Sequence, residues 1–582
     1  MNQSCYTVIT FAPVQGFIEK SRKLRDLYGS SYLLSYISWV ICNAAEQYGC
    51  KVISPALPNI TQGMPNQIII KGDFPEDNAK SAVSTAWKCV TEACREWIEN
   101  NVGDKDDYKS WKRIWGLWTK YAWEFFWVQG EKGESISQVR QKLNEKKRAR
   151  DWTGINWQGE SSTLSGADAI AYPKLGLICD PRKYNYQQEK QDVTDFYTAL
   201  SEKLGESFIK SVGLKVADEK MSERSKEYGE SFINPDEELS VPELIKRLIT
   251  HKAVATKIEE RFNQLFKDNK VLNELEQLSE DLNPESFTDL NRFNQKSFQG
   301  WFHGDGDNAR KYFQSLANRP EESEKTQEFS LEMREWGDYF KKLPESSNIP
   351  NWRVIYAGGD DFLGVFYNRK TAIDCVNFFS RFKSDIWNEN NTTKDEKKKI
   401  TVSVGFVWAF PGIPQRDVLQ HCREAEKSAK NNGRDRIAFR ILFNNGNHLE
   451  WVCPWWLLED GLLSKYRDRE GKQNWTHIYN DVAVLESRHA FDDDGLDVAL
   501  RLLEIYFPHH LDKIKNKNKN KNKNKQLHRE DEDLTKIDAG ILEEEHKYYK
   551  ENSEEIDQTK VNKALTNWII NLAKVGFHLC HQ

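Results

Sequence analysis

Histidine is missing from the first 250 residues of this 582-residue chain, and closely spaced cysteine pairs are missing throughout. All twelve histidines lie at or after His251, so the first 250 residues offer no histidine to a metal site or as a general base. The ten cysteines include no Cys-x-x-Cys pair and no short spacing that would assemble four thiolates around zinc. We therefore expect reduced, buried thiols and no zinc.

Long apolar runs and an excess of positive charge are also missing. No uninterrupted apolar stretch approaches the roughly 20 residues of a membrane span, and the N-terminal residues lack the basic and apolar regions of a signal peptide. Lys and Arg number 83 against 89 Asp and Glu, whereas a free-standing nucleic-acid binder usually carries a positive excess. We expect a cytoplasmic protein without membrane contact, in which any RNA contact is local or shared with partner proteins.

Apolar periodicity predicts an α+β chain in which one order of elements occurs twice. Two segments each alternate strand-like and helix-like stretches in the order β-α-β-β-α-β, the order of a ferredoxin-like palm. Charged helical patterns fill the remainder. The expected organisation is a first palm-like domain at 1–150, a mainly helical domain at 151–295, a second palm-like domain at 296–450 and a helical C-terminal domain at 451–582.

Short β-prone runs mark the strands of both palm-like domains. In the second domain, WRVIYA and FLGVFY flank the tight turn GGDD, as in a hairpin. The expected strands are 5–11, 51–54, 67–71 and 120–128 in the first domain, and 298–307, 352–357, 362–367, 400–409 and 436–442 in the second. The principal expected helices are near 30–48, 325–342, 371–387 and 415–430.

The GGDD turn carries the chemistry. Gly358 and Gly359 permit positive φ and close approach to a ligand, and Asp360 and Asp361 project from the tip of the hairpin. Two carboxylates about 4 Å apart repel by about 4 kcal/mol at an effective dielectric of 20, so a site that keeps both ionised favours a divalent cation between them. The alternative is a solvated turn, because Asp and Gly are common in turns.

A second acidic pair ends the strand that we expect beside this hairpin. Asp305 and Asp307 supply hard oxygen ligands, and Gly306 adds a backbone carbonyl. Oxygen ligands without His or Cys favour Mg²⁺ or Mn²⁺ over zinc. The combination of the two acidic motifs favours a metal site over a plain turn.

Two further sets of residues suit phosphate binding. Lys430 and Arg434 lie four residues apart at a helix end, where they could hold a triphosphate or simply complement the helix dipole. Ser30 and Ser31 follow Gly29 at the expected start of a helix, where they could receive a phosphate or serve as an N-cap.

Three other segments have a simpler interpretation. Residues 21–26 (SRKLRD) are expected to form a solvated or RNA-adjacent face rather than a catalytic one. The tryptophans at 111, 115 and 118 favour a core or subunit interface over a base-stacking platform. The Lys/Asn tract at 513–525 alternates from Lys515 to Lys525 without an apolar residue and predicts a solvated loop.

Together these motifs resemble a known family, the large palm-domain subunit, of the Cmr type, in type III CRISPR effector complexes. The palm also resembles, more distantly, that of the GGDEF diguanylate cyclases. The motifs that carry the resemblance are FAPVQGFIEKSRKLRDLYGSSYLLS (11–35), GDGDN (304–308), YAGGDDFLGVFY (356–367), TVSVGFVWA (401–409) and AKNNGRDR (429–436).

The resemblance implies an enzyme that is activated by target RNA and polymerises ATP into cyclic oligoadenylate messengers. It implies partners as well, namely the other subunits of the complex, the guide RNA and the target RNA. The implied metal ligands are Asp305, Asp307, Asp360 and Asp361, with catalysis by Asp305, Asp360 and Asp361. The implied nucleotide contacts are Gly306, Asn308, Gly358, Gly359, Lys430, Arg434, Ser30 and Ser31.

The sequence departs from that family in three places. No His-Asp dipeptide occurs, so the associated HD nuclease activity is not expected. SSTLSG at 161–166 stands where relatives carry zinc-binding cysteines, and Ala309-Arg310 replace a hydrophobic residue and a glycine.

The first palm has no acid between Lys51 and Lys71, so we expect it to bind a second nucleotide without catalysis. Two alternatives remain: AMP transfer to another acceptor such as S-adenosylmethionine, and a silent nucleotide-binding scaffold.

Overall fold

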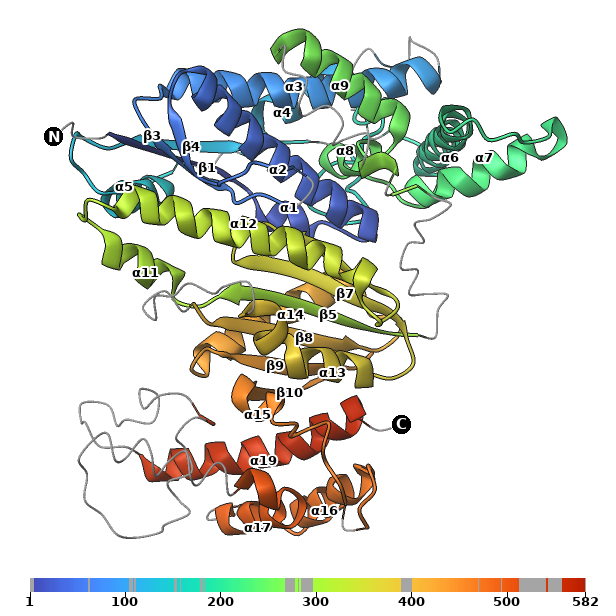
Figure 1. The fold of residues 1–582 in the computed structure, drawn as a ribbon. Coiled ribbons are helices and arrows are strands. Elements are labelled where there is room, and N and C mark those ends of the chain that lie inside the picture. Colours follow the sequence, from blue (N-terminus) through green and yellow to red (C-terminus); the bar gives the residue numbers. More distant parts are fainter. Residues whose placement is uncertain are drawn as a thin grey trace. The chain divides into compact units, whose positions relative to one another are not determined.

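The structure, a computed structural model, describes most of the chain. The described residues are 5–580 without 61–62, 104–107, 109–110, 151–153, 158, 178–179, 181, 183, 267–277, 281, 284–296, 389–399, 469, 493–494, 512–540 and 543–556. The Lys/Asn tract therefore lies outside the described residues. The chain divides into two compact units, Met1–Asn291 with Phe313–Arg334, and Arg292–Tyr312 with Glu335–Gln582, and each contains one β-sheet (Figure 1).

The first unit is built on an antiparallel four-stranded sheet in the order β2-β3-β1-β4. Its strands are β1 (Tyr6–Ala12), β2 (Lys51–Ser54), β3 (Gln67–Lys71) and β4 (Glu124–Gln129). All four lie within the segments where the apolar alternation predicts strands, except for the last residue of β1 and of β4. The order β-α-β-β-α-β, with β1 and β3 central, is that of the ferredoxin-like plan.

Five helices accompany this sheet. They are α1 (Gln15–Glu19), α2 (Leu24–Gln47), α3 (Glu76–Asn101), α4 (Trp111–Tyr121) and α5 (Ile136–Arg148). Helix α2 begins six residues before its expected start at 30. The reason is that Asp26, in its first turn, accepts hydrogen bonds from the backbone N–H groups of Arg22 (2.8 Å) and Lys23 (2.9 Å), which caps the helix.

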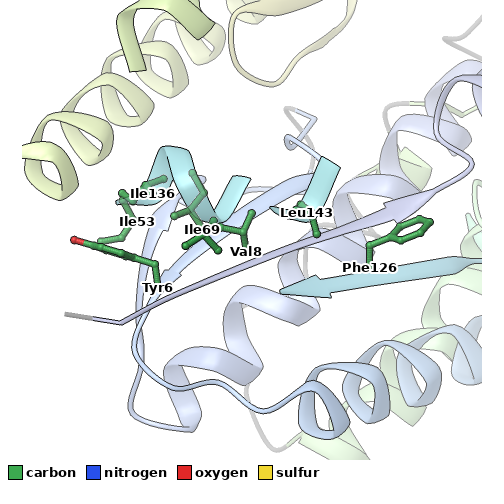
Figure 2. Packing of buried hydrophobic residues seen from close by; sticks show 8 residues of the cluster. Tyr6, Val8, Ile53, Ile69, Phe126, Ile136 and Leu143 are labelled. Carbon is green, nitrogen blue, oxygen red and sulfur yellow. The ribbon is translucent and has the colours of Figure 1, made fainter. Parts of the chain in front are cut away.

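Helix α5 seals one face of the first sheet with apolar side chains. Ile136, Val139 and Leu143 of α5 are fully or almost fully buried. They pack with Tyr6, Val8, Ile53, Ile69 and Phe126 from all four strands (Figure 2). Burial of such side chains contributes roughly 1.5–3 kcal/mol each, so this face of the sheet is a packed core.

The tryptophans of α4 belong to the interior of the first unit. Trp111 and Trp115 are buried, and their rings lie 5.5 Å apart. The backbone carbonyl of Trp118 accepts a hydrogen bond from Nε1 of Trp87 (3.1 Å). The expectation of a core role, rather than a base-stacking surface, is confirmed for Trp111 and Trp115.

The helical segment after the first palm contains α6 (Tyr186–Ser211), α7 (Asp218–Phe232), α8 (Val241–Leu248) and α9 (Lys252–Phe266). Helices α6 and α7 form a hairpin with very close backbones. A Cβ atom added at Gly205 would lie 1.7 Å from the Ser225 carbonyl oxygen, and one at Gly229 would lie 2.0 Å from that of Ser201. Two glycines thus set the spacing of this hairpin.

Buried ion pairs connect α2 to α8. The guanidinium of Arg247 donates to Asp26 (Nε to Oδ1, 2.7 Å) and to Glu237, and all three side chains are at most 8% exposed. Arg25, also buried, donates to Thr250 Oγ1 (2.9 Å). The expectation that residues 21–26 form a solvated face is therefore wrong at Ser21, Leu24, Arg25 and Asp26, which are all buried.

The second unit contains a six-stranded sheet in the order β10-β9-β8-β5-β7-β6. Its strands are β5 (Phe298–Gly306), β6 (Trp352–Ala357), β7 (Asp361–Arg369), β8 (Val402–Ala409), β9 (Arg436–Leu442) and β10 (His448–Pro454). The four strands β8-β5-β7-β6 repeat the order of the first sheet, and β9 joins β8 in parallel. Sequence reasoning predicted β5 to β9 but missed β10.

The helices of the second palm follow the expected order, with one addition after β5. They are α11 (Ala309–Leu316), α12 (Glu322–Ser346), α13 (Ile373–Arg381) with a π-helical turn (Phe382–Trp387), and α14 (Gln415–Asn431). The C-terminal helices in the described residues are α15 (Trp455–Glu459), α16 (Thr476–Ser487), α17 (Leu496–Tyr506) and α19 (Gln558–Cys580). The predicted α+β class is confirmed. No helix in the described ranges combines the length and apolar character needed to cross a bilayer.

Candidate active site on the second sheet

The GGDD turn and the end of β5 meet at one edge of the second sheet. The turn connects β6 to β7, and Asp361 pairs directly with Asp305 across the β5–β7 ladder. The backbone N–H of Gly306 donates to the carbonyl of Asp360 (2.9 Å). The structure therefore brings Asp305, Asp360 and Asp361 together, in the arrangement that the sequence pattern predicts.

Steric crowding explains why both Gly304 and Gly306 of the GDGD motif are glycines. A Cβ atom at Gly306 would lie 2.8 Å from Cβ of Asp360, and one at Gly304 would lie 2.1 Å from the Phe362 ring. Gly306 thus lets the second acidic motif approach the turn closely. Within the turn, the N–H of Gly358 faces the carbonyl of Asp361 at 3.3 Å.

The two faces of the second sheet differ in chemistry. Because side chains alternate along a strand, Phe302 lies on one face and His303 and Asp305 on the other. The Phe302 ring lies 5.5 Å from Phe366 and 5.6 Å from Phe379, in an aromatic core. Acids and bases gather on the opposite face, which α14 covers.

The crowded acids have strongly raised pKa values. Burial and the negative charges of Asp360 and Asp361 raise the pKa of Asp305 to about 8, although Lys430 opposes the shift. Burial and the charge of Asp361 also raise the pKa of Asp360. Lys430 therefore offsets only part of the burial and the mutual repulsion of these acids, and a divalent cation would relieve the rest.

Lys430 reaches this site from α14. Its ammonium contacts Oδ2 of Asp305 and lies 2.6 Å from Oε1 of Glu426, one turn earlier on the same helix. Burial lowers the pKa of Lys430, but attraction by Asp305 and Glu426 outweighs it, so the pKa is higher than that of a free lysine. Sequence reasoning missed Glu426, although its place four residues before Lys430 was a usable signal.

His303 and Tyr356 complete the polar face and were also missed. Nε2 of His303 lies 3.0 Å from Oδ1 of Asp361, and Tyr356 Oη lies 3.5 Å from both oxygens of that carboxylate. Burial lowers the pKa of His303, but the charge of Asp361 outweighs it and the pKa is raised. His303 precedes Asp305 by two residues in one strand, so alternation along β5 places both on one face.

Asp307 lies apart from the other acids, with both oxygens engaged. Oδ1 accepts from Ser403 Oγ (2.7 Å), and Oδ2 accepts from Thr401 Oγ1 (2.9 Å) and from the backbone N–H of Asp435 (2.9 Å). Asp307 is buried, with 1% of its surface exposed. The geometry thus departs from the expected metal ligand and is that of an anchor for the loop after α14.

This anchored loop has an unusual backbone. Gly433, Arg434 and Asp435 have φ of +113°, +60° and +54°, and left-handed conformations are costly for residues other than glycine. The hydrogen bond from Asp435 to Asp307 helps to hold them. Arg434 is exposed, so its guanidinium is accessible to a ligand. Asn308, also named from the sequence, has φ of +62° directly after the anchor.

Ser30 and Ser31 belong to the first unit and lie inside α2 rather than before it. Ser30 is fully buried, and its Oγ donates to the carbonyl of Asp26 (2.7 Å). The expected position at the start of a helix is therefore wrong, because the backbone N–H groups here are within the helix, whereas nucleotide contact by these two serines stays a prediction. Ser31 is partly exposed.

The donor set fits Mg²⁺ or Mn²⁺ but not a closed metal cage. In the part of the chain that the structure describes, no group of three or more His, Cys, Asp or Glu side chains is arranged to hold a metal ion. Mg²⁺ sites in nucleotide-processing enzymes commonly use one or two carboxylates, with water and substrate phosphates as the other ligands. Asp305 and Asp360 match that requirement, and the repulsion that raises their pKa values would be relieved by a cation.

The anchor role of Asp307 leads to a prediction. We expect Asp307→Asn to lower the free energy of unfolding of the second unit by about 1–3 kcal/mol, because a buried acceptor loses partners. We expect Mn²⁺ affinity, measured by titration of the purified chain, to change less than two-fold. The matched variant Asp305→Asn should weaken Mn²⁺ binding at least ten-fold. Equal weakening by the two variants would instead make Asp307 a ligand.

Two regions of the chain match models of known protein families. Residues 298–438 match the model of the Cas10/Cmr2 second palm domain, and residues 6–92 match that of the CRISPR-associated protein Cmr2 N-terminal region. The first match includes GDGDN and GGDD, and the second includes α2. The resemblance identified from the motifs is thereby confirmed. No curated protein matches the sequence.

Solved structures that match this chain include chains of the Csm1-Csm4 cassette and of the type III-B Cmr-beta complex. A chain of the apo Csm1-Csm4 cassette matches 87% of this chain at 13% identity and a TM-score of 0.41, and this chain spans 64% of its length. A chain of the type III-B Cmr-beta complex in the apo state matches 97% of this chain at 11% identity, with 81% of its own length covered and a TM-score of 0.42. A chain of the Csm1-Csm4 cassette in complex with one ATP matches 86% at 14% identity, with 65% of its own length covered and a TM-score of 0.38.

Proposed function

We propose that the chain is a metal-dependent nucleotidyltransferase that uses ATP and acts within a type III CRISPR effector complex. The observation that carries the proposal is the convergence of Asp305, Asp360 and Asp361 at one sheet edge, beneath Lys430. These groups lie inside the segment that matches the Cas10/Cmr2 second palm domain. That family match supports the same chemistry.

The acids would bind the cation, and the basic residues would bind the triphosphate. Asp305 and Asp360 would hold the cation, and Asp361, oriented by His303, would add a third negative charge beside it. A bound Mg²⁺ or Mn²⁺ would supply Lewis-acid activation of the attacking 3′-hydroxyl and charge neutralisation at the leaving pyrophosphate. Lys430 and Arg434 would contact the triphosphate, and Gly358 and Gly359 would let the nucleotide approach the backbone.

Positioning of the reactants is the main contribution of the protein. Phosphoryl transfer depends largely on alignment and on electrostatic stabilisation of the spreading negative charge. The anchored loop that displays Arg434 is suited to this task, because Asp307 and the sheet fix its backbone. We propose cyclic oligoadenylates as products, and the remaining complex subunits, guide RNA and target RNA as partners.

Product analysis tests this function. The assembled complex should be incubated with labelled ATP and Mg²⁺ or Mn²⁺, with and without target RNA and S-adenosylmethionine, and the products identified by mass. We expect cyclic oligoadenylates that depend on the metal and on target RNA. An AMP conjugate would replace the proposed acceptor, whereas ATP binding without turnover would make the chain a scaffold and overturn the proposal.

A further inference from the structure

A lysine ammonium occupies the position next to the carboxylate that we assign to the metal. Nζ of Lys430 contacts Oδ2 of Asp305 and lies 2.6 Å from Oε1 of Glu426. The Lys430 side chain is 23% exposed and that of Glu426 is 11% exposed, so both charges are largely shielded from water. The ammonium is therefore the counter-ion of both carboxylates.

The packing of α14 restricts where this ammonium can go. A Cβ atom at Gly405 of β8 would lie 2.2 Å from the backbone nitrogen of Glu426, so the helix lies directly on the strand. Glu426 and Lys430 are four residues apart and share one face of α14. Because the helix cannot shift without moving the sheet, Lys430 has both Asp305 and Glu426 within reach.

We propose that Lys430 is a built-in counter-ion that competes with the divalent cation for Asp305. Glu426 is then a positioning residue that keeps the ammonium beside the nucleotide site once the cation has taken its place. The inference rests on the proposed function, because that function assigns Asp305 to the metal. Its physical basis is that the Asp305 carboxylate binds a metal ion less strongly while one of its oxygens is in contact with the Lys430 ammonium.

Mn²⁺ binding without nucleotide tests the competition. The full chain should be titrated with Mn²⁺ and the free ion followed by electron paramagnetic resonance. We expect Lys430→Met to tighten binding about five-fold or more, because removal of the charge frees Asp305. The matched control is Lys427→Met, which removes an exposed charge from the same helix and should change the affinity less than two-fold. Unchanged or weaker binding by Lys430→Met would overturn the proposal.

A double-variant cycle tests the role of Glu426. In a Glu426→Gln background, Lys430 keeps only Asp305 as a carboxylate partner, so Lys430→Met should tighten Mn²⁺ binding by a larger factor than in the native background. Equal factors in the two backgrounds would indicate charge repulsion at a distance and would overturn the positioning role. The double variant also covers the case in which Lys430→Met alone fails to fold because Glu426 is left buried and unpaired.

One further variant separates this inference from the proposed function. In Asp360→Asn with Asp361→Asn, Mn²⁺ binding should weaken at least ten-fold. If the native chain does not bind Mn²⁺ through these acids, the proposed function and the inference both fail. If binding does depend on these acids but Lys430→Met does not tighten it, the inference alone fails.

Discussion

Replacing Asp360 and Asp361 together by alanine should abolish nucleotidyl transfer by the assembled complex. The acids of the turn lie next to Asp305, and their removal takes away the negative charge that would hold a divalent cation. Electrostatic stabilisation by such a cation is worth several kcal/mol, so a loss of about 100-fold or more is the minimum expected. Initial rates of product formation from labelled ATP measure the effect.

Two controls accompany this experiment. Asp338→Ala removes an acid of α12 that pairs with Lys342 on the surface, and it should leave the rate unchanged. Circular dichroism and co-purification of the complex establish that the double variant folds and assembles. Near-normal turnover by a folded double variant would exclude this active site.

The second large effect concerns stability and Arg247. Its guanidinium is the buried partner of both Asp26 and Glu237. In Arg247→Met, Asp26 stays buried without its guanidinium partner and Glu237 keeps only Lys23, and breaking a buried pair in this way typically costs about 3–5 kcal/mol. We expect a loss of that size at pH 7, measured by urea unfolding together with hydrogen exchange in α2 and α8. Arg224→Met, at an exposed ion pair with Glu227, should have no measurable effect.

The pH dependence of this loss has a defined sign. Burial raises the pKa of Glu237, but Arg247 and Lys23 outweigh it and lower the pKa to about 2, and the pKa of Asp26 is also lowered. In the native chain this stabilisation is present above the unfolded pKa, near 4.5, and is lost as the pH falls toward 2. Without Arg247, burial raises the pKa of Asp26, and Lys23 alone opposes the same effect on Glu237, so the variant gains stability when Asp26 is protonated. The difference in free energy of unfolding between the native chain and Arg247→Met should become smaller from pH 7 to pH 4. A difference that stays constant over this range would contradict this account.

Local patterns were sufficient to predict the strands and the acidic turn. The segments FQGWFHGDGD and YAGGDDFLGVFY carry their alternation and turn residues within ten or twelve positions, and the structure forms β5, β6 and β7 there. Pairing of Asp305 with Asp361 follows from the βαββαβ order, which places the first and third strands side by side. These features depend on short segments and on one topological rule.

Features that depend on distant partners could not be predicted in the same way. Asp307 looks like Asp305 in the sequence, but its oxygens are satisfied by Thr401, Ser403 and the backbone of Asp435, about 95 to 130 positions later. Residue Asp26 likewise reads as part of a solvated charged run, because its partner Arg247 is 221 residues away. Strand β10 is a different case, because its signal is local and was overlooked: Leu449, Trp451 and Cys453 stand at every second position after the turn at 443–447.

The helix that follows the fourth strand of each sheet differs in a way that bears on engineering. In the first palm that helix, α5, covers the sheet with Ile136, Val139 and Leu143, whereas α14 approaches the second sheet over Gly405 and brings Glu426 and Lys430 to it. Grafting a GGDD turn between β2 and β3 would therefore not create a second catalytic centre. The grafted acids would lie beside an apolar layer, without a residue in the place of Lys430. A working transplant therefore has to exchange α5 as well.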